Sequence, residues 1–448
     1  MANAFKSGCV RGPYPESWNK ETAYRIGRNL HRIVDTDKTV IGWDARLSSE
    51  EVFSYLSKGL TDSGIDVYSI GLVDTSALYF ANMAYDFESS IMITASHNPP
   101  GDNGMKFHRK NVVPIDKKTG LAELEKLVQQ DPGPPVERKG SVHTLDIRQA
   151  YLDAHKRFMK GIGSLKVAYD CSNGAASIFL NDMLRMVPGD YHVINDTPDG
   201  NFPNHGPDPL QPENLIQLKD LVLSTGSAMG ICFDGDGDRA IFLDETGTMI
   251  MPDLMLAFLS RYYLVHYPEL MGDDHAIIAD LRSSSSVGEY VEQIGGTIVS
   301  TKTGHTAIQS GIQNNHGLIG AELSGHYYFR DYYGQDSAFI AMLMAMSIMS
   351  QEEKALSELI GDIKRHSFSG EINFSSNHPD ELLSSLETHY RSTEGAIDKT
   401  EGVRVSFTNW WFLARASHTE PVLRLVVEAE NDELMHDKIR EIKEVITQ

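Results

Sequence analysis

One pattern recurs along the chain: an apolar segment ends in an aspartate and continues directly into small polar residues. It occurs as "VIGWDARLSSEEV", "VAYDCSNGAASIF" and "IIADLRSSSSVGE", in which the aspartates are Asp44, Asp170 and Asp280. Strand-like and helix-like segments alternate for most of the length, which is typical of α/β architecture. A single echo of this kind is common in any α/β protein, whereas three at domain-like spacing favour related α/β domains.

The length of the chain and a segment rich in proline and glycine predict several domains. At 448 residues the chain is too long for a single core. The segment Asp131–Gly140 is rich in proline and glycine and is a plausible boundary. In the last part, strand-like segments cluster between helical patterns near Pro379–Tyr390 and Asn431–Gln448, which indicates an α+β domain. We predict an α/β protein of four domains, three of them similar α/β units and the last α+β, at 1–144, 145–247, 248–365 and 366–448.

Composition narrows the class of protein. Hydrophobic residues make up 41% and charged residues 23% of the chain, and no window holds the ~18 consecutive apolar residues of a membrane span. The segment "MANAFKSGCVRGPYPESW" lacks the apolar region of a signal peptide. Cys9, Cys171 and Cys232 are widely spaced and form no CxxC pair, which favours reduced thiols. We expect a cytoplasmic protein without membrane partners.

The formal net charge of −22 argues against general nucleic-acid binding, because phosphate backbones require a basic surface. An anionic ligand would require the few basic residues to be concentrated where it binds.

The segment "MITASHNPPGDNGMKF" joins an apolar strand to a rigid polar loop. Ser96 stands where the strand ends, which is where α/β sheets present catalytic groups. Pro99 and Pro100 stiffen the exit by fixing φ, and a nucleophile needs such rigid support. For an isolated "SHNP", a Ser/Asn turn that closes a strand is the commoner explanation.

The segment "CFDGDGDRAIFLDE" alternates Asp234, Asp236 and Asp238 with glycines. In an extended backbone these side chains face the same way, and three neighbouring carboxylates repel unless a cation neutralises them. Oxygen ligands indicate a hard metal such as Mg²⁺. A plain acidic turn stays a minor alternative.

Two other metal or phosphate motifs fit this segment poorly. An EF-hand needs glycine where Arg239 stands and needs flanking helices, whereas "AMGICF" and "RAIFLD" look like strands. A haloacid-dehalogenase-type phosphatase would carry its aspartate nucleophile near the N-terminus, and here arginine follows the third aspartate. Metal binding in a strand–loop–strand context is the better interpretation.

The segment "GLIGAELSGHYYF" places Glu322, Ser324 and His326 at alternate positions after a strand. A carboxylate, a hydroxyl and an imidazole on one side suit a ligand with several hydroxyl groups, and a merely polar strand face is the alternative. Upstream, "STKTGHTAI" offers Lys302 and His305 at a strand-to-helix turn, although a lone histidine that opens a helix is more often structural than catalytic.

The segment "LARASHTEPVLRL" gathers donors suited to phosphate, including the Arg415 guanidinium and the hydroxyls of Ser417 and Thr419. A loop between two strands is the alternative. Across the chain, cations lie in or beside these polar loops, namely Arg11, Lys106, Arg239, Arg282, Lys302, Arg415 and Arg424. This concentration points to a phosphorylated small molecule.

With these motifs in place, the chain resembles the α-D-phosphohexomutases, in particular the phosphomannomutase/phosphoglucomutase branch. The resemblance spans nearly the whole chain and rests on "TASHNP", "DGDGDR", "GAELSGH" and "RASHTEP" in that order, with "KTGH" between the second pair. It implies four domains around a central cleft, with a phosphoserine loop, a metal-binding loop, a sugar-binding loop and a phosphate-binding loop along the chain.

The resemblance also implies roles for individual residues. Ser96 would carry a phosphoryl group, and Asp234, Asp236 and Asp238 would hold Mg²⁺ together with it. Lys106 and Arg11 would lie near the reacting oxygen, while His305 and His326 would serve positioning or proton transfer. The implied substrate-binding residues are His97, Arg239, Arg282, Lys302, Glu322, Ser324, Arg415, Ser417, His418, Thr419 and Arg424.

The implied reaction interconverts hexose 1-phosphate and hexose 6-phosphate, of mannose and/or glucose, through hexose 1,6-bisphosphate, which also serves as activator. We expect small sugar phosphates as the partners, and a monomer or weak homodimer. The alternatives are a phosphoglucosamine mutase, disfavoured by Leu323 where that branch tends to have glutamine, and, less favoured, a Mg-dependent sugar phosphatase or a non-catalytic phosphosugar-binding protein.

Overall fold

The computed structural model describes residues 4–417 and 422–447. The chain divides into two compact units, each built from separated segments. Unit 1 comprises Met1–Ile250 and Ser324–Leu356, and unit 2 comprises Met251–Leu323 and Ser357–Gln448. In the described part of the chain, no helix combines the length and apolar character needed to cross a membrane.

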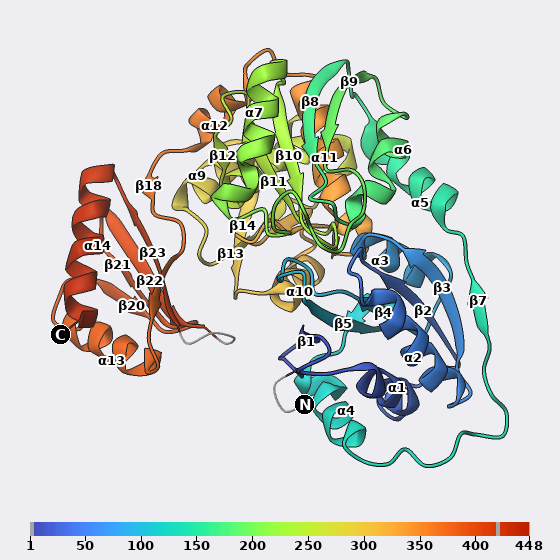
Figure 1. Ribbon diagram of the computed structural model, residues 1–448. Helices are drawn as coiled ribbons and strands as arrows, with labels where there is room; N and C mark the ends of the chain where they lie inside the picture. Colours follow the sequence, from blue (N-terminus) through green and yellow to red (C-terminus); the bar gives the residue numbers. More distant parts are fainter. Residues whose placement is uncertain (1–3, 418–421, 448) are drawn as a thin grey trace. The chain divides into compact units, whose positions relative to one another are not determined.

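The first sheet of unit 1 is mostly parallel at its centre. Strands run in the order β1-β5-β4-β2-β3-β7 (Figure 1). β6 pairs with β5 at the side of this order. β2 is parallel to β3 and β4, whereas β5 is antiparallel to β4 and β1. The strands are β1 (Val10–Pro13), β2 (Lys38–Trp43), β3 (Asp66–Leu72), β4 (Ser89–Ile93), β5 (Asp102–Arg109), β6 (Val113–Pro114) and β7 (Val142–Thr144), and the helices are α1 (Lys20–Asn29), α2 (Ser49–Thr61), α3 (Thr75–Ala84) and α4 (Ala122–Val128).

Helix α2 follows the first of the recurring aspartates, and Ser48 is its N-cap but gives it no side-chain hydrogen bond. Ser48 Oγ instead accepts a hydrogen bond of 2.8 Å from Asn103 Nδ2, and Ser49 Oγ donates one of 2.9 Å to Asp44 Oδ1. Both hydroxyls are therefore committed to neighbouring loops rather than to helix capping. The helix ends at Thr61, with Asp62 as its C-cap.

The second sheet of unit 1 has the order β12-β11-β10-β8-β9. β8, β9 and β10 run parallel, while β10 and β11 form an antiparallel hairpin whose last pair is Phe233 with Ala240. The hairpin confirms the strands expected on both sides of the acidic loop. The elements are β8 (Leu165–Asp170), β9 (Gly189–Ile194), β10 (Met229–Phe233), β11 (Ala240–Asp244) and β12 (Met249–Ile250), with α5 (Arg148–His155), α6 (Leu180–Leu184) and α7 (Ile216–Thr225).

The segment that returns to unit 1 adds the antiparallel pair β16 (Tyr327–Phe329) and β17 (Gln335–Asp336), followed by α11 (Ala338–Met349). Every residue of α11 is buried, as its sequence "AFIAMLMAMSIM" requires. Tyr169 on β8 donates a hydrogen bond of 3.2 Å to Met346 Sδ of this helix. α11 is therefore a core helix of unit 1.

Unit 2 begins with a parallel α/β layer, in which β13 lies between β14 and β15. Its elements are α8 (Pro252–Arg261), β13 (Ala276–Asp280), α9 (Ser285–Gln293), β14 (Thr297–Thr301), α10 (His305–Asn315), β15 (Ile319–Ala321) and α12 (Leu356–Ile363), whose first residue belongs to unit 1.

The remainder of unit 2 is an antiparallel sheet with the order β18-β23-β22-β21-β20 and with β19 beside β23. Helices α13 and α14 cover one face of it (Figure 1), where Tyr390, Phe412 and Ile442 are among the buried core residues. The predicted α+β domain is confirmed. The elements are β18 (Ser367–Phe368), β19 (Ile372–Ser375), α13 (Pro379–Tyr390), β20 (Ala396–Asp398), β21 (Val403–Ser406), β22 (Trp410–Ala416), β23 (Val422–Ala429) and α14 (Asp432–Thr447).

The recurring aspartates occupy equivalent local positions. Asp44 follows β2, while Asp170 and Asp280 end β8 and β13. In each case the carboxylate accepts a hydrogen bond from the backbone N–H two residues later, at 3.1, 2.8 and 2.9 Å. The echo in the sequence therefore marks the same side-chain-capped turn at the carboxyl end of three strands.

Candidate active site

Ser96 lies in a buried loop just after β4, as predicted. It has a positive φ of 53° and is only 1% exposed. Its N–H donates to Thr94 Oγ1 at 2.7 Å, and its Oγ lies 3.1 Å from Asp234 Oδ2 and 3.2 Å from His97 Nδ1. A left-handed serine is uncommon and costs energy, so surrounding contacts must hold it there.

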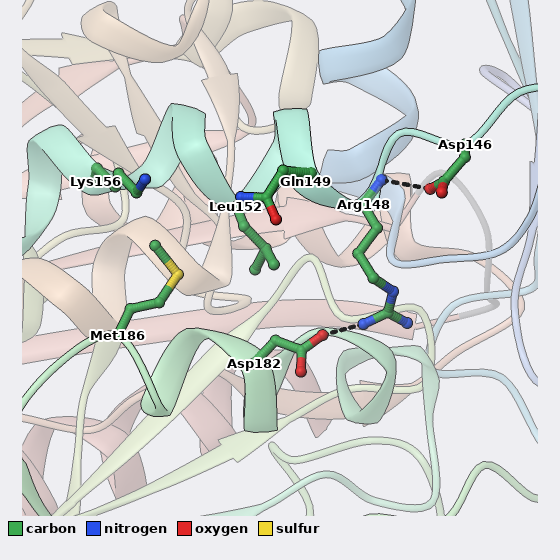
Figure 2. A pocket seen from close by; sticks show the side chains of 7 residues that line it. All are labelled: Asp146, Arg148, Gln149, Leu152, Lys156, Asp182 and Met186. Atoms are coloured by element: carbon green, nitrogen blue, oxygen red, sulfur yellow. Dashed lines mark hydrogen bonds and ion pairs between the residues drawn. The ribbon is translucent and has the colours of Figure 1, made fainter.

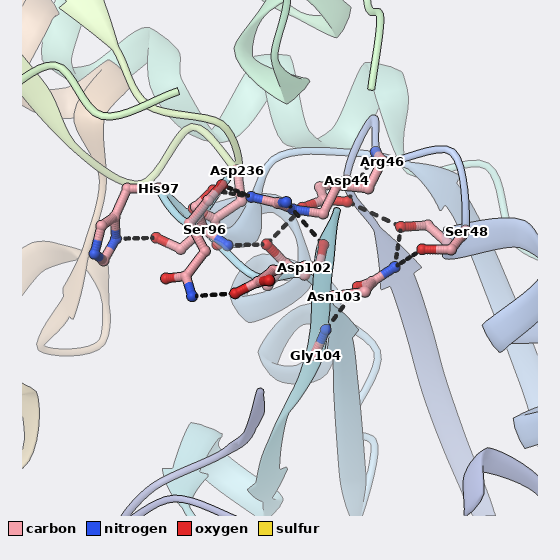
Figure 3. Close-up of polar contacts among 12 residues, drawn as sticks. Asp44, Arg46, Ser48, Ser96, His97, Asp102, Asn103, Gly104 and Asp236 are labelled. Carbon is pink, nitrogen blue, oxygen red and sulfur yellow. Dashed lines mark hydrogen bonds and ion pairs between the residues drawn. The ribbon is translucent and has the colours of Figure 1, made fainter. Parts of the chain in front are cut away.

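Arg46 supplies those contacts (Figure 3). Its guanidinium donates to backbone carbonyl oxygens along the loop, those of Ser96 at 2.7 Å, Asn98 at 2.6 Å, Pro99 at 2.6 Å and Asp102 at 2.8 Å. Its Nε donates to Asp44 Oδ2 at 3.1 Å, and both side chains of this ion pair have no exposed surface. One buried arginine thus fixes the backbone on both sides of the serine.

Asp234, Asp236 and Asp238 form a buried cluster in the β10–β11 hairpin loop. Their oxygens lie within 4.8 Å of one another, a spacing that could hold a metal ion. The extended backbone assumed from the alternating sequence is wrong: the loop turns, with Gly237 at φ 70° and its N–H donating to Asp234 O at 3.2 Å. The turn, and not strand alternation, brings the carboxylates together.

Two carboxylate oxygens of this aspartate cluster receive no hydrogen bond from the described residues. Asp236 Oδ1 and Asp238 Oδ1 are buried and have no hydrogen-bond partner among the described residues. The opposite oxygen of Asp236 accepts from Thr75 Oγ1 at 2.8 Å. Buried anionic oxygens without donors are costly, so the donor set fits a hard cation that takes oxygen ligands.

Lys106, on β5, pairs with the same cluster. Its Nζ lies 2.8 Å from Asp236 Oδ2 and 2.7 Å from Asp238 Oδ2. Burial would lower the pKa of Lys106, but the two carboxylates raise it above its usual range, so the ammonium stays charged. Arg11, on the adjacent strand β1, is paired in register with Gly104, and its charge also acts on Lys106 and Asp236.

The cluster's carboxylates differ in pKa. Burial raises the pKa of Asp234 well above its usual range, and Asp236 and Asp238 raise it further. Burial acts in the same direction on Asp236, but Lys106 outweighs it and holds the pKa of that carboxyl below its usual range. Burial and like charge therefore favour the neutral form more for Asp234 than for Asp236, and a bound cation would favour the charged form of both.

His326 lies between an acid and a base in unit 1. Its Nδ1 is 2.6 Å from Asp336 Oδ2, and its Nε2 accepts a hydrogen bond of 2.9 Å from Arg239 Nε. Residues 239 and 326 also form an isolated antiparallel bridge. Because Nε2 accepts a hydrogen bond, the ring proton lies on Nδ1, which donates it to Asp336.

The extended arrangement expected for Glu322, Ser324 and His326 is also wrong, because the chain turns after β15 and Gly325 has a φ of 89°. Ser324 and His326 belong to unit 1, whereas Glu322 belongs to unit 2, where it is 8% exposed. Ser324 Oγ is buried and has no hydrogen-bond partner in the described residues.

Unit 2 brings together Arg282, Arg415 and Arg424 around Glu371. Glu371 Oε2 lies 2.8 Å from Arg282 Nη1 and 3.2 Å from Arg415 Nη2, and Oε1 lies 2.8 Å from Arg424 Nη1. Arg415 and Arg424 are direct neighbours across β22 and β23. Arg282, which stands far from the other two arginines in the sequence, thus converges with them on one carboxylate.

The other predicted residues of unit 2 lie in loops or at element ends. Lys302 is exposed between β14 and α10, and His305 is the first residue of α10, which confirms the strand-to-helix turn. Ser417 follows β22, and its N–H donates to Val422 O at 3.0 Å. His418 and Thr419 lie outside the described residues.

A surface pocket in unit 1 contains none of the predicted site residues (Figure 2). It lies between α5 and α6, and an ion pair of Arg148 with Asp182 crosses it. Its lining residues are Asp146, Arg148, Gln149, Leu152, Lys156, Asp182 and Met186.

Three residues that contact the predicted ones were not predicted from the sequence, namely Arg46, Asp336 and Glu371. A signal existed for Arg46, because Asp44–Arg46 and Asp280–Arg282 share the pattern Asp-x-Arg after a strand. Asp336 and Glu371 stand in segments without a distinctive pattern, and only the folded chain brings them to the site.

Comparison with known proteins places the whole chain in one family. Models of the phosphoglucomutase/phosphomannomutase domains match in order: α/β/α domain I at residues 2–132, domain II at 149–247, domain III at 251–366 and the C-terminal domain at 371–445. The predicted four-domain α/β fold is thereby confirmed.

Individual relatives and a solved structure point to the same family. The chain is 36% identical over 438 residues to the phosphomannomutase of Escherichia coli strain K12, covering 96% of this chain and 95% of the relative. It is 33% identical over 447 residues to the phosphohexose mutases of Xanthomonas campestris pv. campestris, covering 99% of both. A crystal structure of a phosphoglucomutase/phosphomannomutase family protein from Burkholderia thailandensis superposes with a TM-score of 0.89 at 27% identity, covering 100% of this chain and 98% of that one. The chain belongs to the phosphoglucomutase/phosphomannomutase family.

Proposed function

We propose that this protein is a phosphohexomutase that interconverts hexose 1-phosphate and hexose 6-phosphate, of mannose and/or glucose. The observation that carries the proposal is the position of Ser96 Oγ, 3.1 Å from Asp234 in a buried cluster of three aspartates. Lys106 pairs with the other two aspartates. A hydroxyl, a cation site and a charged ammonium in one place suit phosphoryl transfer, which needs mainly positioning and charge neutralisation.

Asp234, Asp236 and Asp238, with a phosphoryl group on Ser96, would hold Mg²⁺. The family is Mg-dependent, and the two donorless oxygens of Asp236 and Asp238 support this ligand set. When bound, Mg²⁺ supplies positive charge that offsets the phosphoserine, which carries about −1.5 to −2 at neutral pH.

The proposed chemistry is two phosphoryl transfers at Ser96. In the first, the Oγ–P bond breaks and a bond forms from phosphorus to the free hydroxyl oxygen of the sugar phosphate. A base of the site takes the proton of that hydroxyl, and Ser96 Oγ gains a proton. The product of this step is hexose 1,6-bisphosphate. In the second, Ser96 Oγ loses its proton and bonds to the other phosphorus of the bisphosphate. The bond from that phosphorus to the sugar oxygen breaks, the sugar oxygen gains a proton, and the monophosphate leaves. The bisphosphate would also serve as activator, because it can transfer a phosphoryl group back to a Ser96 that has lost its own.

Lys106 and Arg11 would stabilise the oxygen that reacts, and His326 would position it or move its proton. Glu322 and Ser324 would bind sugar hydroxyls, with His305 in support. The proposed phosphate-binding residues are Arg415, Arg282, Arg424, Lys302, Ser417, His418 and Thr419, joined at the serine by His97 and Arg239. We also propose domain limits at 1–144, 145–247, 248–365 and 366–448, a monomer or weak homodimer, and a cytoplasmic location.

Phosphorus NMR tests the reaction directly. The protein with Mg²⁺ and a trace of glucose 1,6-bisphosphate receives glucose, mannose or glucosamine 1-phosphate in turn. We expect 6-phosphate signals from glucose and/or mannose 1-phosphate, with turnover that depends on the bisphosphate. Release of inorganic phosphate as the main product would establish a phosphatase, and the absence of any change would leave a binding protein.

A further inference from the structure

Glu371 stands at the centre of the arginine cluster, although nothing in its sequence context "SGEINF" marks it. It precedes β19 and is 19% exposed. Its two oxygens contact donors of Arg282, Arg415 and Arg424 at 2.8, 3.2 and 2.8 Å. Burial would raise the pKa of Glu371, but the three arginines lower it below its usual range, so the side chain is an anion at neutral pH.

The carboxylate binds the donors that a phosphate group would use. Arginine forks bind carboxylates and phosphates through the same N–H groups. A phosphate at these donors therefore competes with Glu371 and meets the repulsion of a nearby anion.

The arginines do not depend on Glu371 alone for their positions. Arg282 Nε donates to Asp280 at 2.9 Å, and its Nη2 also pairs with that carboxylate. Arg415 Nη1 lies 3.9 Å from Glu401, and its backbone is paired with that of Arg424. Removing the charge of Glu371 would leave these supports in place, so loss of competition should outweigh loss of order.

We propose that Glu371 is an internal anion that occupies the phosphate-binding arginines and weakens their hold on phosphorylated ligands. The inference rests on the proposed function, which assigns these arginines to the phosphate of the substrate. Both phosphates of the bisphosphate must in turn be bound and released during one reaction cycle. A clamp without an internal competitor would bind tightly and release slowly.

The test is calorimetric titration of Glu371→Gln with inorganic phosphate and with glucose 6-phosphate, without Mg²⁺. Glutamine keeps the shape and one acceptor but removes the charge. We expect about tenfold tighter binding of both ligands. In the mutase assay, KM and kcat should both fall, because release becomes slower. Unchanged or weaker phosphate binding by the variant would overturn the inference.

Two controls make the result specific. Glu289→Gln removes one charge from the same unit at a carboxylate that pairs with Arg365 and His366, and phosphate affinity should stay unchanged. In Glu371→Gln/Arg415→Ala, the gain should be mostly lost. A gain that persists in full would place the phosphate elsewhere and overturn the inference.

If the glutamine variant does not fold, Glu371→Asp serves instead. It keeps the charge but shortens the reach, so we expect about twofold to threefold tighter phosphate binding, and an unchanged affinity would count against the inference. The binding measurement does not require turnover. Tighter phosphate binding by the variant of a protein that fails the NMR assay would support the role of Glu371 and refute the mutase activity. Turnover in the NMR assay without tighter phosphate binding by the variant would support the mutase activity and refute the role of Glu371.

Discussion

Replacing Arg46 should loosen the serine loop and destabilise unit 1. In Arg46→Met the buried carboxylate of Asp44 loses its cation, and four carbonyl oxygens between Ser96 and Asp102 lose a donor. Breaking a buried ion pair by removing one partner costs about 3–5 kcal/mol. Arg46→Lys keeps the charge but offers three donors instead of five, so we expect about half that loss.

The penalty should depend on pH. Burial raises the pKa of Asp44, and Arg46 opposes that rise, so the carboxyl of the methionine variant will have a still higher pKa. A carboxyl whose pKa is raised on folding destabilises the folded state above the pKa of its unfolded form. Because the unfolded carboxyl is the same in both proteins, the difference in unfolding free energy between wild type and Arg46→Met should grow as the pH rises above the raised folded-state pKa of Asp44 in the wild type.

The assay combines urea unfolding at several pH values with hydrogen exchange of the amides of residues 94–104 and with turnover. We expect lower urea midpoints, faster exchange in the loop and at least tenfold slower turnover, because a nucleophile must be held in place. Arg25→Met is the control: its pair with Glu21 is partly exposed, and such pairs contribute about 0–1 kcal/mol. Wild-type midpoints, exchange and turnover in Arg46→Met would refute the positioning role.

Three further substitutions test the remaining parts of the site. Ser96→Ala should lower sustained turnover by several orders of magnitude while circular dichroism stays unchanged, and near-normal turnover would exclude a covalent role. Asp236→Asn should shift the Mg²⁺ dependence of the rate to higher concentration more than it weakens sugar-phosphate binding, since one of three anionic ligands is lost; an unchanged dependence would argue against a metal site there. Arg415→Ala should weaken binding of hexose 1-phosphate and hexose 6-phosphate alike by about 10- to 150-fold in calorimetry, and a loss for only one isomer would indicate separate clamps.

The sequence predicted the parts of the site that short segments encode. Strand ends and polar loops were readable from local pattern, so the positions of Ser96 after β4 and of the acidic hairpin after β10 followed from the sequence alone. The aspartate cluster was predicted for a wrong reason. Alternation in an extended strand was assumed, whereas glycine at φ 70° allows a turn that groups the same side chains.

Contacts between distant segments were not predictable from local pattern. Arg46 binds a loop some fifty residues away, and Glu371 meets Arg282 from another part of unit 2. Such partners depend on which strand ends lie side by side, and spacing along the chain does not encode that. Asp336 likewise reaches His326 only through the short β16–β17 pairing.

The two Asp-x-Arg turns show why similar arginines have different uses. In both, the aspartate caps the turn and binds the arginine Nε, so the guanidinium is aimed by its own strand end. The remaining N–H groups of Arg46 bind backbone carbonyls, which cannot move aside without leaving buried acceptors unpaired. Nη1 of Arg282 instead binds the side chain of Glu371, so its release would leave no backbone acceptor unpaired. If the arginine cluster binds phosphate as we propose, Arg282 would be available to it, whereas Arg46 is committed to the fold.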